Sequence, residues 1–118
     1  MNDIIRTHAT HGTAAVELGP HAPKPTALTE GLTEVSASTW SNGRIDTGLW
    51  ECTPGDFTAE RNGYTEICTI LSGSVTLEVE GQQPERLQAG DVFVMPSGWK
   101  GVWHVHETLR KHYTTIDD

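Results

Sequence analysis

The sequence predicts an all-β protein, a sandwich or jelly-roll barrel built as one domain. Short segments rich in β-branched and aromatic residues recur from residue 35 onward. Turn residues separate these segments, and no run of about ten residues shows the period of an amphipathic helix. A chain of 118 residues has room for one hydrophobic core, so we expect no second domain.

Eight strands are expected in chain order, over residues 35–40, 47–53, 64–71, 74–80, 84–87, 92–95, 99–106 and 111–116. Residues 75–80 alternate strictly between apolar and polar side chains, as a strand with one solvated face does. The expected reversals contain glycine or proline, which supply positive φ angles or a preset φ. They include residues 41–43, 53–55, 61–63, 72–73 and 80–81.

Residues 1–33 differ in composition from the rest of the chain, which predicts an N-terminal arm ahead of a barrel domain over 34–118. The arm has few large apolar side chains to offset the entropy of ordering, so we expect it to be disordered or to lie over another surface. It carries three histidines, His8, His11 and His21, whose spacing suits no rigid metal site. Solvated histidines are the expectation.

Charge and composition exclude several classes of partner. The net charge of −8 argues against binding to nucleic acids or to anionic membrane surfaces. No apolar run is long enough to cross a bilayer, and the first residues lack the pattern of a signal peptide, so a cytoplasmic protein is expected. Cys52 and Cys68 lie in strand-like segments and are predicted to be small buried side chains rather than a disulfide or a nucleophile.

Two segments with fixed glycine spacing carry a resemblance to a known family. In the first, Glu66 follows Gly55 and precedes Gly73 by six intervening residues; in the second, the turn Pro96-Ser97-Gly98 follows Gly90. A Gly-Trp-x-Gly-x-Trp run over 98–103 and the later Arg-Lys-x-Tyr over 110–113 complete the pattern. Over residues 35–116 the chain resembles the cupin superfamily, and in particular the small cupins related to ureidoglycine aminohydrolase and to the ethanolamine-utilisation cupin.

This resemblance implies a double-stranded β-helix, or jelly-roll, barrel whose lumen usually holds a metal bound by three histidines and one glutamate. Other residues take the histidine positions here: Ala59 and Arg61, or Glu60 and Asn62 in the shorter spacing, and Gly101. The carboxylates left as donors are Glu66, with Glu60 and Glu51 as further candidates. We therefore predict no cofactor and no tightly bound transition metal.

The cupin register, together with the period of two of a strand, predicts which side chains enter the lumen. The inward set is Tyr64, Glu66, Cys68 and Ile70 on one strand, and Gly101, Trp103 and Val105 on another. The indole of Trp103 is expected to fill space that a metal would need. His104 and His106 would then point outward, with no carboxylate clearly placed beside them, as structural or solvated side chains.

The candidate site residues are those that combine flat apolar surface with charge. We expect Trp50, Arg61, Tyr64 and Trp103 to contact a ligand, and Glu66 and Lys111 to carry any chemistry. Each aromatic residue has the alternative of being plain barrel core. Glu66 either pairs with a cation such as Arg61 or Lys111, or has a raised pKa that suits proton transfer.

Two hypotheses about function follow. The first is a binding module without catalysis, a homodimer that holds a small polar metabolite such as a sugar, ureide, amino acid or carboxylate. The second is an enzyme, a lyase, isomerase or hydrolase, in which Glu66 transfers a proton with Lys111 or Tyr64 as the opposite partner. The homodimer, and the exchange of the N-terminal arm between its subunits, are implied by the resemblance.

Overall fold

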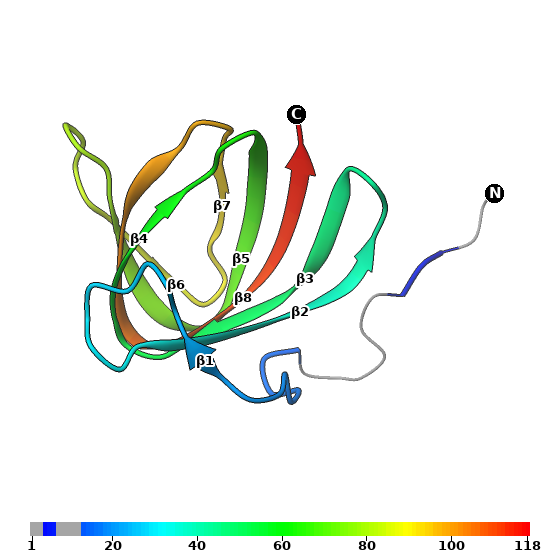
Figure 1. Ribbon diagram of the computed structural model, residues 1–118, viewed down its shortest axis with the longest axis horizontal. Coiled ribbons are helices and arrows are strands. Elements are labelled where there is room, and N and C mark those ends of the chain that lie inside the picture. Colours follow the sequence, from blue (N-terminus) through cyan, green and yellow to red (C-terminus); the bar gives the residue numbers. More distant parts are fainter. Residues whose placement is uncertain (1–3, 7–12) are drawn as a thin grey trace.

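The computed structural model describes residues 4–6 and 13–118, and the expected all-β jelly-roll fold is confirmed (Figure 1). In this part of the chain no helix is long and apolar enough to cross a membrane. The strands are β1 (Ala22–Pro23), β2 (Thr33–Ser41), β3 (Ile45–Cys52), β4 (Gly55–Glu60), β5 (Tyr64–Glu78), β6 (Glu85–Gln88), β7 (Val92–Met95) and β8 (Lys100–Asp117).

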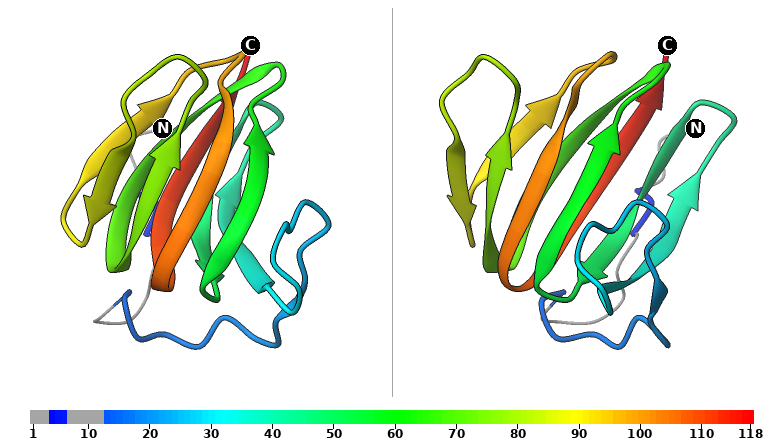
Figure 2. Two further views of the ribbon diagram at one scale, coloured as in Figure 1. Left: turned by 90° about the vertical axis from the view of Figure 1, so that its left-hand side faces the viewer. Right: turned by 60° about the vertical axis from the view of Figure 1, so that its left-hand side comes forward.

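All pairings between these strands are antiparallel, and two long strands join the two halves of the barrel. The second half of β8 pairs with β3, and the first half of β5 pairs with β7. The first half of β8 pairs with β4, and the second half of β5 pairs with β6. Figure 2 shows this second group from its outer side, in the order β6-β5-β8-β4.

The expectation of separate strands over 64–71 and 74–80, and over 99–106 and 111–116, is wrong. Each pair forms one continuous strand, β5 or β8, which bends through bulges where their pairing register shifts. Gly73 has a φ of 85° and lies at this bend. A Cβ at Gly73 would come within 2.2 Å of the carbonyl oxygen of Thr108, so the bend needs glycine for space as well as for φ.

The bulge in β5 changes which residues face inward. Before it, the buried residues are Glu66, Cys68 and Ile70; after it, they are Val75 and Leu77, and Ser74 is buried at the bulge itself. One long strand can therefore bury residues of even number in one half of the barrel and of odd number in the other.

Strands β1 and β4 were not predicted. Residues 55–60 contain glycine, acidic residues and alanine, which are depleted in strands, and only Phe57 and Thr58 favour extended backbone. Pairing with β8 on one side holds β4 in place. On its other edge the segment 26–29 is hydrogen-bonded to it, through the amides of Leu28 and Thr58.

The hydrophobic core forms one cluster inside the barrel. Its buried members include aromatic, aliphatic and sulfur side chains: Trp50, Phe57, Ile70, Val75, Leu77, Met95, Trp103, Val105 and Leu109. Cys52 and Cys68 are both free and buried, which confirms the expectation for them. Burial raises the pKa of each thiol to about 12, so neither is suited to act as a nucleophile at neutral pH.

The described part of the predicted arm, from residue 13 onward, packs against the barrel of its own chain. Leu32 belongs to the core, and Arg110 on the outer face of β8 donates hydrogen bonds to the carbonyls of Thr13 and Val16. His21 hydrogen-bonds to Glu51 at 2.8 Å, so the expectation that His21 is solvated is wrong. His8 and His11 lie outside the described residues.

Candidate functional site

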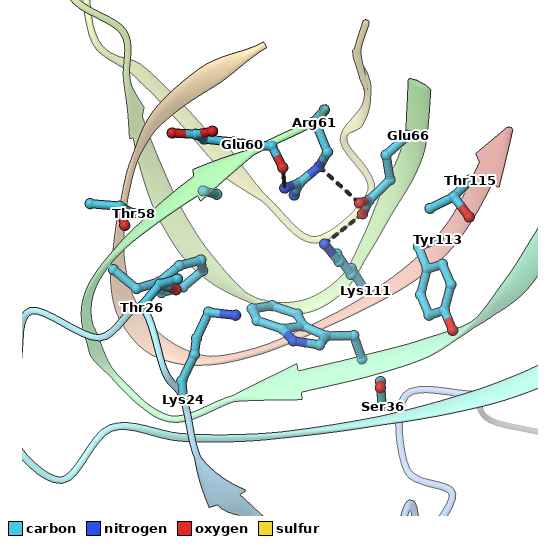
Figure 3. A pocket seen from close by; sticks show the side chains of 13 residues that line it. Lys24, Thr26, Ser36, Thr58, Glu60, Arg61, Glu66, Lys111, Tyr113 and Thr115 are labelled. Atoms are coloured by element: carbon cyan, nitrogen blue, oxygen red, sulfur yellow. Dashed lines mark hydrogen bonds and ion pairs between the residues drawn. The ribbon is translucent and has the colours of Figure 1, made fainter. Parts of the chain in front are cut away.

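A cavity of about 330 Å³ occupies the lumen of the barrel (Figure 3). Its wall contains the rings of Trp50, Phe57 and Tyr113, from strands β3, β4 and β8. Gly48 of β3, which pairs with Tyr113 of β8, leaves room for one of these rings. A Cβ at Gly48 would lie 2.8 Å from the hydroxyl oxygen of Tyr113 and would meet the backbone of Ala37. The sequence therefore places glycine where the aromatic wall needs space.

Three charged side chains meet at one end of this cavity. Nζ of Lys111 lies 2.6 Å from Oε2 of Glu66, and Nε of Arg61 lies 3.0 Å from Oε1 of the same carboxylate. Arg61, Glu66 and Lys111 are only 8%, 5% and 5% exposed. We call these three residues the ion triad. They come from strands β5 and β8 and from the turn after β4, so the fold of the barrel brings them together.

The ion triad settles the ionisation of Glu66. Burial opposes the charged form, but attraction from Lys111 and then Arg61, with hydrogen bonds from Cys68 and Lys111, outweighs it and holds the pKa of Glu66 below its ordinary value. The thiol of Cys68 donates to Oε2 at 2.9 Å. Of the two predicted environments for Glu66, the structure contains the ion pair and not the raised pKa.

Trp103 lies in the core next to the ion triad and not on the cavity wall. Its side chain is 0% exposed and stacks on Phe57, with ring centroids 5.4 Å apart. Nζ of Lys111 sits over both Trp50 and Trp103, at 4.6 and 4.7 Å from the ring centroids. The indole of Trp103 was expected to fill the space that a metal would need beside Glu66. Two cations, Arg61 and Lys111, occupy that space instead, and Trp103 lies on the far side of Lys111, so the expectation is wrong in detail.

The residues around Glu66 do not fit the metal that the cupin resemblance implies. Its two carboxylate oxygens each face a fixed cation, which would repel a metal ion. No group of three or more His, Cys, Asp or Glu side chains suited to a metal occurs in residues 4–6 and 13–118. Glu51 is bound to Arg110 and His21, while Glu60 faces Lys100 and Asn62. Neither carboxylate is ion-paired or hydrogen-bonded within the ion triad.

Four of the six predicted site residues line the cavity: Trp50, Arg61, Glu66 and Lys111. Trp103 and Tyr64 do not. The hydroxyl of Tyr64 hydrogen-bonds to the carbonyl of Glu60 at 3.4 Å, and its ring lies 6.0 Å from the guanidinium carbon of Arg61. Tyr64 therefore adjoins a member of the ion triad without reaching the cavity.

Sequence reasoning missed residues at the N-terminal side of the cavity. Lys24 and Thr26, which precede the first long strand, line it together with Ser36. Nζ of Lys24 pairs with Glu34 at 2.7 Å and lies 4.6 Å from the centroid of Phe57. Lys24 stands between two prolines in a segment that shows no periodic pattern of hydrophobic residues. Its position on the cavity wall could therefore not be predicted from the sequence, because it depends on how this segment folds onto the barrel.

His104 faces away from the lumen as expected, but two carboxylates flank it. Its Nδ1 is 2.9 Å from Asp56 on β4, and its Nε2 is 2.7 Å from Glu78 on β5. The expectation that no carboxylate lies beside this histidine is wrong, because strand pairing places residues distant in sequence at its two sides. The hydrogen bond to Glu78, followed by the one to Asp56, outweighs desolvation and raises the pKa of His104.

Comparison with known proteins agrees with this architecture. The family model of the EutQ-like cupin domain matches residues 39–113. The EutQ protein of Clostridium difficile has a similar structure, with a TM-score of 0.65 and 19% identity over 74% of this chain and 70% of that one. No curated protein matches the sequence.

Two further solved structures belong to the DUF861 family. The protein from Thermotoga maritima is 32% identical over 55% of this chain and 73% of its own, with a TM-score of 0.52. The protein from Pseudomonas syringae has a TM-score of 0.72 at 17% identity, over 88% of this chain and 45% of its own. At identities below 25%, such a likeness concerns the fold alone.

Proposed function

We propose that this chain, which belongs to the family of EutQ-like cupin domains, is a binding module that holds a small polar metabolite in its barrel lumen. The observation that carries the proposal is the cavity of about 330 Å³, where the rings of Trp50 and Phe57 adjoin the ion triad. Apolar walls with a few fixed polar groups are typical of small-molecule sites. A sugar, ureide, amino acid or carboxylate would suit this volume. The net charge of −8 supports such a partner over nucleic acid or an anionic membrane.

We further propose that the module works without a tightly bound transition metal. The support is the donor set: Glu66 is one carboxylate held by two cations, and a metal would have to displace at least one of them. Elemental analysis after exhaustive dialysis should find well below one equivalent of zinc, manganese, iron or nickel. About one equivalent would contradict this part of the proposal.

The alternative, an enzyme that transfers a proton through Glu66, has less support. A carboxylate whose pKa is held below its ordinary value is a weak base, and it is not protonated at neutral pH to act as an acid. Tyr64, one of its two predicted partners, does not line the cavity. The other, Lys111, already donates to Glu66 at 2.6 Å.

A thermal-shift screen with sugars, amino acids, ureides and carboxylates, followed by turnover assays on each hit, tests the proposal. Ser36→Trp should abolish the shifts because Ser36 lines the cavity and a larger side chain would fill it. Gln83→Trp, an exposed position outside the cavity, is the matched control. Hits that are consumed would favour the enzyme. Hits that survive Ser36→Trp would place binding elsewhere and contradict the proposal.

The homodimer implied by the family is also a proposal. Its support is an exposed apolar patch on the outer surface of two paired strands, formed by Ile67 of β5 and by Val92 and Val94 of β7. A second copy would cover this patch. Light scattering should give twice the chain mass of 12.9 kDa, and Val94→Lys should shift the mass towards the monomer. A monomer at all concentrations in the unmodified chain would refute the dimer.

A further inference from the structure

We infer that the lumen is built for an anion, so that the metabolite is a small molecule bearing a carboxylate or a similar oxyanion. This inference rests on the proposed function and narrows its ligand to one chemical class. It begins with the charges of the ion triad, which is two cations, Arg61 and Lys111, against the one carboxylate of Glu66. Among the described residues no second carboxylate is paired with either cation.

One positive charge in the lumen is therefore left without a protein counter-charge. All three side chains are at least nine-tenths buried, so the only water that can solvate this charge is water inside the cavity. A buried charge without a partner is strongly unfavourable. The rings of Trp50 and Trp103 stabilise the Lys111 ammonium through their faces, but a ring quadrupole carries no net charge. An anion that enters the cavity would supply the missing charge.

The hydrogen-bonding groups point to the same class of ligand. In the part of the chain that the structure describes, the buried side-chain polar atoms without a hydrogen-bond partner are Nε of Arg61 and Nε1 of Trp103. Both are donors. Nε of Arg61 lies within ion-pair distance of Glu66, yet its N–H is not aimed at the carboxylate well enough to form a hydrogen bond. The N–H of Trp103 lies in the core, off the cavity wall, so the donors that face a ligand belong to the Arg61 and Lys111 side chains, which line the cavity, and an oxyanion would offer them acceptors.

The rest of the wall indicates how such a molecule would lie. Its anionic group would approach Arg61 and Lys111 (Figure 3). Its remaining atoms would pack against the rings of Trp50 and Phe57, which also line the cavity. Two other charged side chains on the wall already have counter-charges, Lys24 with Glu34 and Glu60 with Lys100, so the uncompensated charge is that of the ion triad. Glu66 then acts as a positioning residue that holds both cations in place and does not itself receive the ligand.

Matched pairs of probes that differ in charge but not in shape provide the test. Benzoate and benzamide, and 2-methylpropanoate and 2-methylpropanamide, would be titrated calorimetrically into the full chain at pH 7.5 in a buffer low in chloride. Each acid should bind about tenfold or more tightly than its amide, because hydrogen bonds to charged groups are stronger than neutral ones. Lys111→Met, which makes the ion triad neutral, should abolish the preference.

Arg86→Met is the control because it changes the total charge equally at an exposed residue of β6 that does not line the cavity. It should keep the tenfold preference. Arg61→Gln, checked for folding by circular dichroism, serves as the second variant if Lys111→Met does not fold. Amides that bind as tightly as acids, or a preference that survives in both lumen variants, would overturn the inference.

Failure of the inference and failure of the proposed function give different results. If neutral compounds bind and Ser36→Trp blocks them, the lumen binds metabolites but not by charge, and only the anion inference is lost. If neither the probes nor the wider screen bind, the proposed function itself is wrong.

Discussion

Replacing Glu66 by glutamine should strongly destabilise the protein, although the two side chains have nearly the same shape. The substitution removes the only negative charge of the ion triad and leaves Arg61 and Lys111 as two like charges in a buried site. The amide can still accept hydrogen bonds, so the change isolates the effect of charge.

The distances set the size of the effect. At an effective dielectric constant of about 20, ion pairs of 3.0 and 2.6 Å each have a gross attraction of about 6 kcal/mol, most of which offsets desolvation. Removing one partner of a buried pair typically costs about 3–5 kcal/mol. We therefore expect Glu66→Gln to lower the free energy of unfolding by that amount. Lys111→Met should cost less, since it leaves a neutral pair of Arg61 and Glu66.

Urea unfolding followed by tryptophan fluorescence would measure these differences. Glu60→Gln is the matched control, because the side chain of Glu60 is 47% exposed and 3.6 Å from Lys100, where an ion pair contributes only about 0–1 kcal/mol. The pKa of Glu66 is held below 4.5, so the stabilisation is present above pH 4.5 and is lost as the pH falls through the folded pKa. A loss no greater than that of Glu60→Gln, or a difference that grows in acid, would refute the reasoning.

Two further predictions concern the outer face and the bend of β5. The pKa of His104 is raised above 6.5, so the protonated histidine should make the natural chain more stable than His104→Gln below pH 6.5, and this advantage should be lost as the pH rises through the folded pKa. Denaturation of both chains at pH 6 and at pH 9 measures the advantage. A difference in the free energy of unfolding that is constant, or larger at pH 9, would contradict the prediction. Gly73→Ala should lower the melting temperature more than Gly81→Ala. Both glycines have positive φ, for which alanine costs about 1–2 kcal/mol, but only Gly73 has a backbone oxygen within 2.2 Å of the new Cβ. Equal shifts in the two variants would show that the close approach to Thr108 does not matter.

The fold could be predicted because its signals are local. Glycine and proline mark the reversals, and the spacing around Glu66 and Pro96 is sufficient for the cupin resemblance. The same local signal gave a wrong prediction at Gly73, where a turn between two strands was expected. A glycine with positive φ is also found in β-bulges, and Gly73 lies in such a bulge within β5. Only the pairing of β5 with β8 distinguishes the two uses.

The candidate site was harder to predict because it depends on contacts between distant segments. Charge alone suggested that Glu66 meets Arg61 or Lys111, and the structure shows that it meets both. The place of Trp103 beyond Lys111, and not on the cavity wall, depends on packing across the barrel, which a period of two cannot specify. Lys24 gave no signal at all, because it reaches the cavity from a segment with no strand pattern of its own.

That contribution of Lys24 affects how relatives of this chain should be compared. The family match covers residues 39–113, whereas Lys24, Thr26, Ser36 and Thr115, all on the cavity wall, lie outside it. If the lumen binds a metabolite as proposed, substitutions at the margins of the barrel would change the wall while the matched portion stays the same. Two members that match the family equally well would then differ in the molecules they bind, and a comparison restricted to residues 39–113 would hide the reason.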